Sequence, residues 1–535
     1  MTRLSARDAS FLYSDTTHSN SNVSLIHIYD QSTVEGGRLR FKTLLAHIES
    51  RLDRSPVFRR RLQRVPFELD YPYWVEDANF DLEYHVRHIA LPKPGDWRQF
   101  CIQVSRIHAR PLDLQRPLWE IYVIEGLDSL LDLPAGSFAL LTKTHHAAVD
   151  PASGSELTAL LHDTSPVVAA PTPPAPWFPA RAPGPAAMLW RGVFNTLASP
   201  LRIAPPLSRL LAHRAPGTFT LATGSARRTA EVPPTRFNAV VSPHRVFETR
   251  RFALADFKRI RTLARGATVN DAVLAVCGGA LRRYLGAQGE LPAASLSALA
   301  PYLVPGGEQR RAGGHDFAWL QVQLGTQIAD PAERLAFVRA QTAASASVAR
   351  GVVAREISDI EAQLPASTLA LTSKMLGIAT LGIGRRRALA HCSIANVPGP
   401  QAPLYLCGAR MTYFSALMPI ADGMGLAFAI TSYDGQLIVS PTSCRELMPD
   451  PEFFAQCLRE SFQEALAAAL RKPAPRATRA PRNAKTAKPA TAASKALRGG
   501  AGRERAAAAT PRDAVRSAAR RASASGTAPR ATRPG

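Results

Sequence analysis

The proline-dense stretch in the middle of the chain most constrains how the chain can fold. Eight prolines fall within residues 166–185, a density that excludes regular secondary structure there and predicts an extended connector. On both sides of it, segments with the alternation of strands are interspersed with segments of helical spacing. The 535 residues, 46% of them hydrophobic, suffice for a large core in each part. The sequence therefore predicts an α+β fold of two portions joined by a crossover.

The N-terminal portion combines expected helices and strands. Apolar residues at helical spacing predict a helix over residues 44–52, and a second amphipathic helix is expected over residues 96–110, before the stop at Pro111. Apolar runs over residues 80–91 and 118–124 predict strands.

The C-terminal portion has the same mixed character. Expected strands cover residues 246–254 and 320–324 and a hairpin over 426–439, and expected helices begin at Asn270 and cover 334–384 and 451–470. This mixture predicts a second pairing of a sheet layer with a helix layer.

Within the connector, an apolar island over residues 188–197 contains Trp190 and Phe194 and is followed by leucines among arginines. An apolar face with aromatic residues beside arginines is what an interfacial helix needs to lie in a lipid headgroup layer. Alternatively, the island packs on the body of the protein as part of the crossover. The sequence leaves both interpretations open.

The net charge of +23 is concentrated near the C-terminus. Residues 471–535 contain 17 of the 65 Lys and Arg residues and two of the 42 acidic residues. Because scarcely any apolar side chain accompanies these charges, we expect a disordered tail. Such a polycation can bind nucleic acid or an anionic membrane, or can serve as a spacer. It contains no aromatic residue, which argues against base stacking.

A pair of histidines, His145 and His146, followed by Asp150, is the clearest candidate for chemistry. The pair lies between a strand predicted over residues 138–144 and a helix predicted to begin near Ser153. An imidazole on such a turn is held rigidly, and a carboxylate four positions later can bond one ring nitrogen and leave the other free to take a proton. A structural His–Asp pair is the alternative.

Other functional classes find little support. The six cysteines form no C-x-x-C pair and no spacing typical of zinc, so we expect free thiols in a reducing compartment and no metal. The N-terminus lacks an apolar signal segment, and no window approaches the roughly 20 apolar residues of a membrane span. We therefore expect a protein that is cytoplasmic or bound to a membrane face.

Six motifs occur in the order found in the bacterial wax ester synthase/diacylglycerol acyltransferase family, which the chain resembles over residues 3–470. They are R-L-S-A-R-D-A-S-F at 3–11, P-L-W-E at 117–120, H-H-x-x-x-D at 145–150, N-D at 270–271, N-V-P-G-P at 396–400, and the C-terminal hairpin and helix start at 433–451. Any one motif is weak, but six in order are specific. The resemblance implies two domains of the fold shared by chloramphenicol acetyltransferase and condensation domains.

The resemblance also implies an activity. An acyl group would pass from acyl-CoA to the hydroxyl of diacylglycerol or a long-chain alcohol, with no covalent acyl-enzyme and no cofactor besides the acyl-CoA co-substrate. His146 would be the general base, Asp150 would orient its ring or a neighbouring arginine, and His145 would shape the site. Members of this family would act at the inner membrane face or at lipid inclusions.

Four further residues are assigned to substrate binding by the same resemblance. Asn270 and Asn396 would line the tunnel, with cap or turn roles as the alternative. Pro117 and Trp119 complete the set, with a structural role as the favoured alternative. One departure lies beside the site, because Pro151 follows Asp150 where the family usually has glycine.

Together these observations divide the chain into four parts. They are an N-terminal acyltransferase domain (1–165), a Pro-rich crossover linker (166–234), a C-terminal acyltransferase-like domain (235–471) and a disordered basic tail (472–535). Two functional alternatives remain: an acyltransferase for another hydroxylated acceptor, and a catalytically weak lipid-inclusion or tethering protein whose tail binds DNA or anionic membrane.

Overall fold

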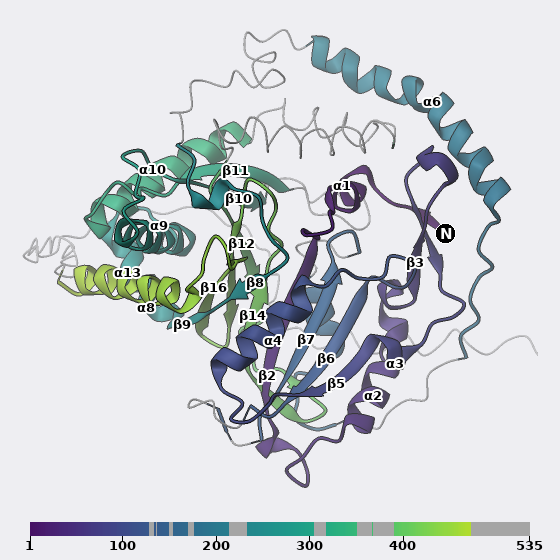
Figure 1. Ribbon diagram of the computed structural model, residues 1–535, viewed down its shortest axis with the longest axis horizontal. Helices are drawn as coiled ribbons and strands as arrows, with labels where there is room; N and C mark the ends of the chain where they lie inside the picture. Colours follow the sequence, from purple (N-terminus) through teal and green to yellow (C-terminus); the bar gives the residue numbers. More distant parts are fainter. Residues whose placement is uncertain are drawn as a thin grey trace, which may run out of the picture. The chain divides into compact units, whose positions relative to one another are not determined.

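The sheet that carries the histidine pair is built from both portions of the chain (Figure 1). The computed structural model describes residues 1–127, 133–134, 136–148, 154–168, 176–212, 233–303, 317–349, 366 and 390–471, without the side chains of 154–157, 200–212, 301–303, 317–319 and 346–349. The strand order is β13 (Tyr405–Leu406), β14 (Ala409–Leu417), β2 (Asn22–Asp30), β7 (Phe138–His145), β6 (Trp119–Glu125) and β5 (Val86–Ala90). Strands β13 and β14 thus add residues from beyond position 400 to the N-terminal strands.

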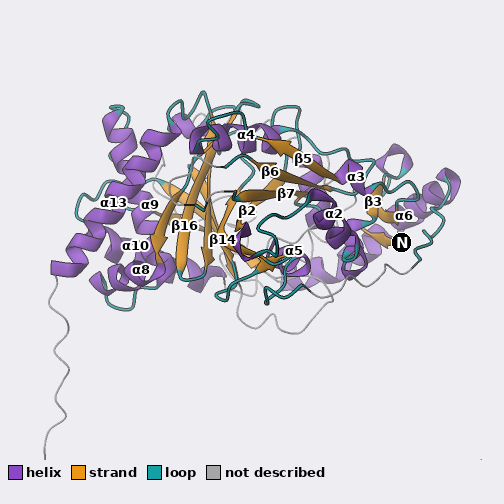
Figure 2. Cartoon of the chain, turned by 90° about the horizontal axis from the view of Figure 1, so that it is seen from below, coloured by secondary structure: helices purple, strands orange, loops and turns teal. Residues whose placement is uncertain are grey.

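The second sheet consists of C-terminal residues alone. Its order is β11 (Phe317–Gln323), β10 (Ser297–Leu303), β12 (Cys392–Pro398), β15 (Leu426–Tyr433), β16 (Gln436–Cys444) and β8 (Arg245–Phe247), with β9 (Arg250–Ala253) also paired to β16. Four helices pack together beside this sheet (Figures 1 and 2): α8 (Leu254–Ile260), α9 (Val269–Ala287), α10 (Pro331–Ala349) and α13 (Pro451–Arg471).

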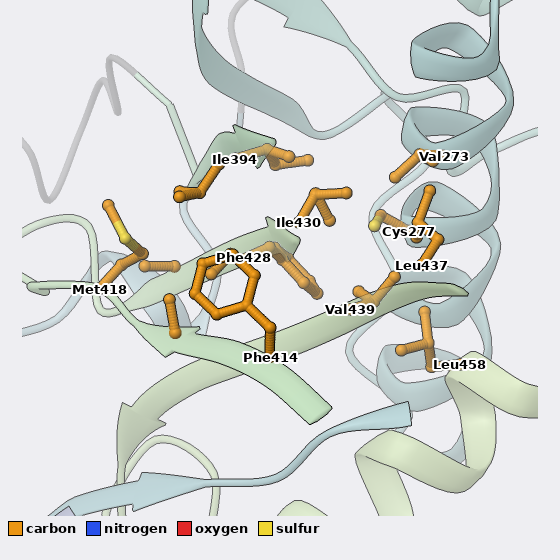
Figure 3. Packing of buried hydrophobic residues seen from close by; sticks show 14 of the residues in the cluster. Val273, Cys277, Ile394, Phe414, Met418, Phe428, Ile430, Leu437, Val439 and Leu458 are labelled. Carbon is orange, nitrogen blue, oxygen red and sulfur yellow. The ribbon is translucent and has the colours of Figure 1, made fainter. Parts of the chain in front are cut away.

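One hydrophobic core continues through both sheets. It includes Leu140 of β7 and Phe414 of β14 in the first sheet and Phe428 of β15 in the second. Figure 3 shows Phe414 beside Phe428, and it shows Val273 of α9 and Leu458 of α13 on the helical side. The two portions are therefore joined by buried apolar surface as well as by strand pairing.

Most local predictions are confirmed. Helix α4 (Trp97–Ala109) begins with a capping box between Asp96 and Gln99. The expected strands at 118–124 and 138–144 are β6 and β7, and the hairpin of β15 and β16 turns at Asp434 and Gly435, both at positive φ. The helix expected over 44–52 is α2 (Phe41–Glu49), which ends sooner because Leu52 starts a separate 3₁₀ turn.

Two predictions are wrong in part. The strand expected over residues 80–91 begins as a helical turn, α3 (Leu82–His85), because the Asp81 side chain accepts a hydrogen bond from the Glu83 amide; only β5 is extended. In the connector, residues 176–184 have no regular structure, as expected, but Pro185–Ala212 form helix α6. Proline is tolerated at the first turn of a helix, so Pro185 starts α6 rather than preventing it. The helix expected over residues 334–384 is present as α10, and its later part lies outside the described residues apart from Ala366.

The N-terminal end forms a small layer beside the first sheet. It consists of helix α1 (Ala6–Ser14) and a three-stranded sheet. The strand order of this sheet is β1 (Thr2–Arg3), β4 (Tyr73–Glu76) and β3 (Arg60–Gln63). Leu4 and Leu12 share a buried cluster with Leu118 and with Ala147, directly after the histidine pair. Among the described helices, none combines the length and apolarity needed to cross a bilayer.

Buried histidines fasten helix α5 (Gly154–Leu161), which follows the histidine motif, to β2. His162 donates through Nδ1 to the Thr158 carbonyl at 2.5 Å and accepts from the Tyr29 hydroxyl at 2.5 Å. His27 of β2 contacts the Thr158 hydroxyl at 3.2 Å. Burial lowers the pKa of His162 to about 4, and burial and the charge of His162 lower the pKa of His27 well below its usual value.

These lowered pKa values predict a loss of stability in mild acid. Both rings stay neutral in the folded chain, whereas the unfolded chain takes up protons below about pH 6.5. The contribution of His162 is complete above that pH and is lost as the pH falls toward 4. His27 contributes in the same direction. We expect His162→Gln to flatten the decline of the melting temperature between pH 7 and pH 5. Equal slopes in wild type and His162→Gln would contradict the assignment.

Glycines in α9 predict a matched pair of stability changes. A Cβ at Gly278 would collide with the Leu324 carbonyl, whereas a Cβ at Gly286 in the same helix would meet nothing within 4 Å. We expect Gly278→Ala to lower the free energy of unfolding by about 1–3 kcal/mol through overpacking. Gly286→Ala should raise it by up to about 1 kcal/mol through helix propensity. Thermal unfolding measures both, and a Gly278→Ala protein at least as stable as wild type would contradict the packing described.

Candidate active site

The histidine pair lies at the end of β7, between two neighbouring strands and helix α1. The amide of His145 donates to the Leu118 carbonyl at 3.0 Å, and Asn22 of β2 is its partner across the sheet. The amide of His146 donates to the Ser21 carbonyl at 2.9 Å. The backbone of both histidines is therefore fixed by β6 on one side and by the chain entering β2 on the other.

Both ring nitrogens of His145 form hydrogen bonds within the protein. Its Nδ1 accepts from the Ala147 amide at 3.0 Å, so the proton is on Nε2, which donates to the Asp15 carboxylate at 3.0 Å. The other oxygen of Asp15 accepts from the Ser21 amide at 2.8 Å. The side chain is 1% exposed. His145 is thus a buried anchor with a fixed tautomer.

The ring of His146 is held by an aromatic neighbour. It stacks on Phe11 of α1, with ring centroids 4.6 Å apart and planes inclined by 14°. His146 is 8% exposed, so it is shielded from bulk water without being sealed as His145 is. Stacking restricts the orientation of the imidazole.

The loop over residues 15–21 connects this pair to the C-terminal portion. Ser19 donates to the Ile420 carbonyl at 2.7 Å, and His18 contacts Asp422 at 3.2 Å. The guanidinium of Arg245 donates to the His18 carbonyl at 2.9 Å. Because Asp15 and Ser21 belong to this loop, residues of the C-terminal portion help to set the position of both histidines.

Asp150 and Pro151 lie outside the described residues, so the H-x-x-x-D geometry stays a prediction. Among the described residues, the carboxylate of Asp15 bonds His145.

The P-L-W-E motif leads into β6, the strand paired with the end of β7 that carries the histidines. Pro117 is buried and bridges to Arg61 of β3. Trp119 is 1% exposed, stacks on His85 at 4.5 Å between ring centroids, and donates through Nε1 to the Phe58 carbonyl at 3.0 Å. These contacts favour the structural role over substrate binding for both residues.

In the N-D motif, the aspartate forms structural hydrogen bonds at the start of α9. Asn270 is exposed in the first turn of α9. Asp271 is 2% exposed, accepts from the amide and hydroxyl of Thr268 at 2.8 Å each, and accepts from the Thr342 hydroxyl of α10 at 2.7 Å. Thr268 and Asp271 therefore form the cap of α9, and the tunnel role of Asn270 stays a prediction.

The N-V-P-G-P motif lies where the two sheets meet. Asn396 is exposed on β12, opposite Ile430 of β15, and β12 contacts α5. The amide of Gly399 donates to the Ser432 carbonyl at 2.8 Å, and a Cβ there would press on Ser432 and Phe414. Glycine is required at this close approach. The strand carrying Asn396 thus reaches the helix after the histidine motif, while lining of a tunnel by Asn396 stays a prediction.

Sequence reasoning missed Asp15 and the role of Phe11. Asp15 lies 130 positions before its partner His145, and no local spacing rule joins them. The available signal was indirect: the strand starting at Asn22 had to pair with the strand ending at His145 before the preceding loop could be placed.

Comparison with known proteins places these features in a family. The family model described as "Wax ester synthase/diacylglycerol acyltransferase catalytic domain" matches residues 4–273, and the model described as "WS/DGAT C-terminal domain" matches residues 313–465.

Individual relatives agree with the family models. A Mycobacterium tuberculosis protein assigned as a diacylglycerol O-acyltransferase is 33% identical over 87% of this chain and 90% of its own. A second protein of that organism with the same assignment is 31% identical over 89% and 99% of the two chains.

Solved structures give the same result for the fold. The wax ester synthase/diacylglycerol acyltransferase from Marinobacter aquaeolei VT8 is 25% identical, covers 88% of this chain and 100% of its own, and superposes with a TM-score of 0.63. The starter condensation domain of rhizomide synthetase is 12% identical over 88% and 94% of the chains, with a TM-score of 0.50, and shares the fold alone. With β14 of the C-terminal portion paired to β2 of the N-terminal portion, a histidine pair at the end of β7 and family models matching both portions, the chain belongs to the wax ester synthase/diacylglycerol acyltransferase family.

Proposed function

We propose that this protein transfers a fatty acyl group directly from acyl-CoA to the hydroxyl of diacylglycerol or a long-chain alcohol, with His146 as the general base. The observation that carries the assignment is that both ring nitrogens of His145 are already hydrogen-bonded within the protein. Its Nδ1 already accepts from Ala147 and its Nε2–H already donates to Asp15, so it has no lone pair to offer an incoming hydroxyl. The adjacent imidazole, oriented by Phe11, is the remaining candidate of the pair.

In this reaction, one imidazole first accepts a proton from the hydroxyl and then donates it to the leaving thiolate. As the acceptor oxygen bonds to the thioester carbonyl carbon, His146 takes the hydroxyl proton. The carbon–sulfur bond then breaks, and the imidazolium returns the proton to the CoA thiolate. Proton and electron pair balance without an acyl-enzyme, a metal or a further cofactor. Asp150 would orient the ring or a neighbouring arginine during this transfer.

Asp15 and His145 act as positioning residues in this scheme. The Asp15 carboxylate holds the His145 ring and the Ser21 amide at once, and the Ser21 carbonyl holds the His146 amide. A shift of the loop over residues 15–21 would therefore move the base. Because small misplacements of a catalytic group are costly, this network supports catalysis without touching the substrate.

The acceptor class is supported by the names of the relatives. Those of Mycobacterium tuberculosis are assigned to diacylglycerol, and the Marinobacter protein is named for wax esters as well. Both acceptors are lipids of low water solubility. We therefore propose that the protein works while bound peripherally to the cytoplasmic face of a membrane or to a lipid inclusion.

A graded series of substitutions tests the assignment of the base. We expect His146→Ala to lower kcat by about 10²–10⁴-fold, which is the usual contribution of general acid–base catalysis. The two oxygens of Asp15 accept hydrogen bonds from the His145 ring and the Ser21 amide, and Asp15→Asn leaves one acceptor oxygen for both. This variant should therefore lower kcat by a smaller factor and also lower the melting temperature. Rates of CoA release and thermal unfolding measure these effects. A His146→Ala enzyme within a few-fold of wild type would refute the proposed base.

An acceptor panel tests the reaction. Palmitoyl-CoA with dioleoylglycerol or hexadecanol should release CoA thiol in proportion to ester formed. An enzyme-only blank is needed because the chain has six free cysteines of its own. Turnover with a hydrophilic alcohol but with neither lipid would instead support the alternative acceptor class. Absence of turnover with every acceptor would support the tethering alternative and contradict the proposal.

A further inference from the structure

Helix α6, from the connector, is fixed to the body of the protein along one face. Met188 is fully buried against Val65 and Tyr73. Gly192 lies so close to the η4 turn (Pro66–Glu68) that a Cβ would be 2.9 Å from Val65 and 3.1 Å from Leu69. This packing confirms the crossover interpretation for one face of the helix.

Polar contacts fix the rotation of the helix about its axis. The amide of Asn195 donates to the Asp70 carboxylate at 2.7 Å, and Thr196 donates to the Leu69 carbonyl at 2.6 Å. Asp70 is itself 3% exposed and paired with Arg3 at 2.8 Å. Because these contacts are directional, the face of α6 opposite to them is held outward.

The outward face carries a stripe of large apolar side chains. Trp190, Phe194 and Leu197 are 74%, 70% and 74% exposed, and their spacing of four and three residues places them on one side of an α-helix. A further exposed aromatic residue, Phe67 at 86%, belongs to the η4 turn that packs on α6. Isolated exposed apolar residues are ordinary, but an aligned stripe of large apolar side chains indicates a docking surface.

The charges of α6 have one sign. Pro185–Ala212 contain Arg191, Arg202 and Arg209 and no acidic residue. Arg191 is exposed and immediately follows Trp190. An apolar stripe with an exposed arginine beside it matches the boundary between lipid acyl chains and headgroup phosphates.

We propose that the Trp190–Phe194–Leu197 stripe of α6 is the surface by which this enzyme docks on a lipid–water interface. The three side chains enter the headgroup and acyl boundary, and Arg191 meets the phosphates. The inference rests on the proposed function for its purpose, since diacylglycerol and long-chain alcohols reside at such interfaces, but the docking itself is measurable without turnover.

A second copy of the chain is a less suitable occupant. A symmetric contact between two α6 stripes would bring Arg191 of each copy near the other, with no acidic residue on either helix to offset the repulsion. At a lipid surface, headgroup phosphates would instead attract Arg191. The arrangement of positive charge therefore favours lipid.

The location of α6 connects docking to catalysis. The helix contacts η4 and, through Met188, the small sheet of β1, β4 and β3, and Figures 1 and 2 both show α6 next to β3. Leu62 of that sheet shares a buried cluster with α1 and with Ala147, the residue after His146. One thin layer thus separates the proposed lipid surface from the helix that carries Phe11, on which the His146 ring stacks.

Vesicle flotation with the full chain tests the proposal. We compare wild type with Trp190→Ser/Phe194→Ser/Leu197→Ser on vesicles of phosphatidylcholine with dioleoylglycerol, at high salt so that the basic tail is screened. We expect the partition coefficient of the triple variant to fall by about tenfold or more, because three large apolar side chains lose their buried environment. Val240→Ser removes an apolar residue that is 55% exposed in the C-terminal portion and should leave partition unchanged.

Two further variants keep the test decisive. Trp190→Phe preserves the stripe, so it should bind as wild type does while losing quenching of tryptophan fluorescence by brominated lipid. Arg191→Glu should weaken binding more on vesicles containing phosphatidylglycerol than on neutral ones.

Separate readouts distinguish failure of this inference from failure of the proposed function. With a short-chain acceptor dissolved in water, the triple variant should turn over at the wild-type rate, whereas with vesicle-borne dioleoylglycerol its rate should fall. Unchanged flotation of the triple variant would overturn the docking surface whatever the activity. Loss of a wild-type dimer in sedimentation, with flotation unchanged, would identify a second copy as the occupant and also overturn it.

Discussion

The antiparallel pairing of β2 with β7 is the constraint on which the site depends. Its register sets Asn22 opposite His145, and the chain that enters β2 must then pass beside the histidine pair. That passage brings the Asp15 carboxylate to His145 and the Ser21 carbonyl to the His146 amide. A slip of one residue would turn every side chain of β2 to the other face and separate these groups. The division of labour between two adjacent histidines therefore follows from strand register.

The same strand ties the two portions of the chain together. β14 pairs with the other edge of β2, and Phe414 of β14 packs on Phe428 of the second sheet. The loop before β2 is bonded to Ile420 and Asp422 in the C-terminal portion. A change in how the two sheets meet would thus reach His146 through one short loop.

Local sequence patterns predicted most helices and strands but not the contacts between residues far apart in the chain. The alternation before His145 and the cap at Asp96 were sufficient for β7 and α4, because both are decided by neighbouring residues. The exchange of β14 into the first sheet and the Asp15–His145 pair join residues more than 100 positions apart, and no periodicity encodes them. The choice of His146 over His145 came from family resemblance, and the geometry of His145 now gives it a physical reason. The role of Asp150 stays a prediction.

The most direct test of this account is histidine-selective ¹⁵N NMR of the ring nitrogens, assigned with His145→Gln and His146→Gln, with and without a hydroxyl acceptor. The account predicts that His145 has its proton on Nε2, protected from exchange by Asp15, and that its signals do not move when the acceptor binds. It predicts that the His146 signals do move, because the acceptor hydroxyl bonds that ring. A His145 ring that exchanges freely and responds to the acceptor, beside an unresponsive His146, would contradict the account.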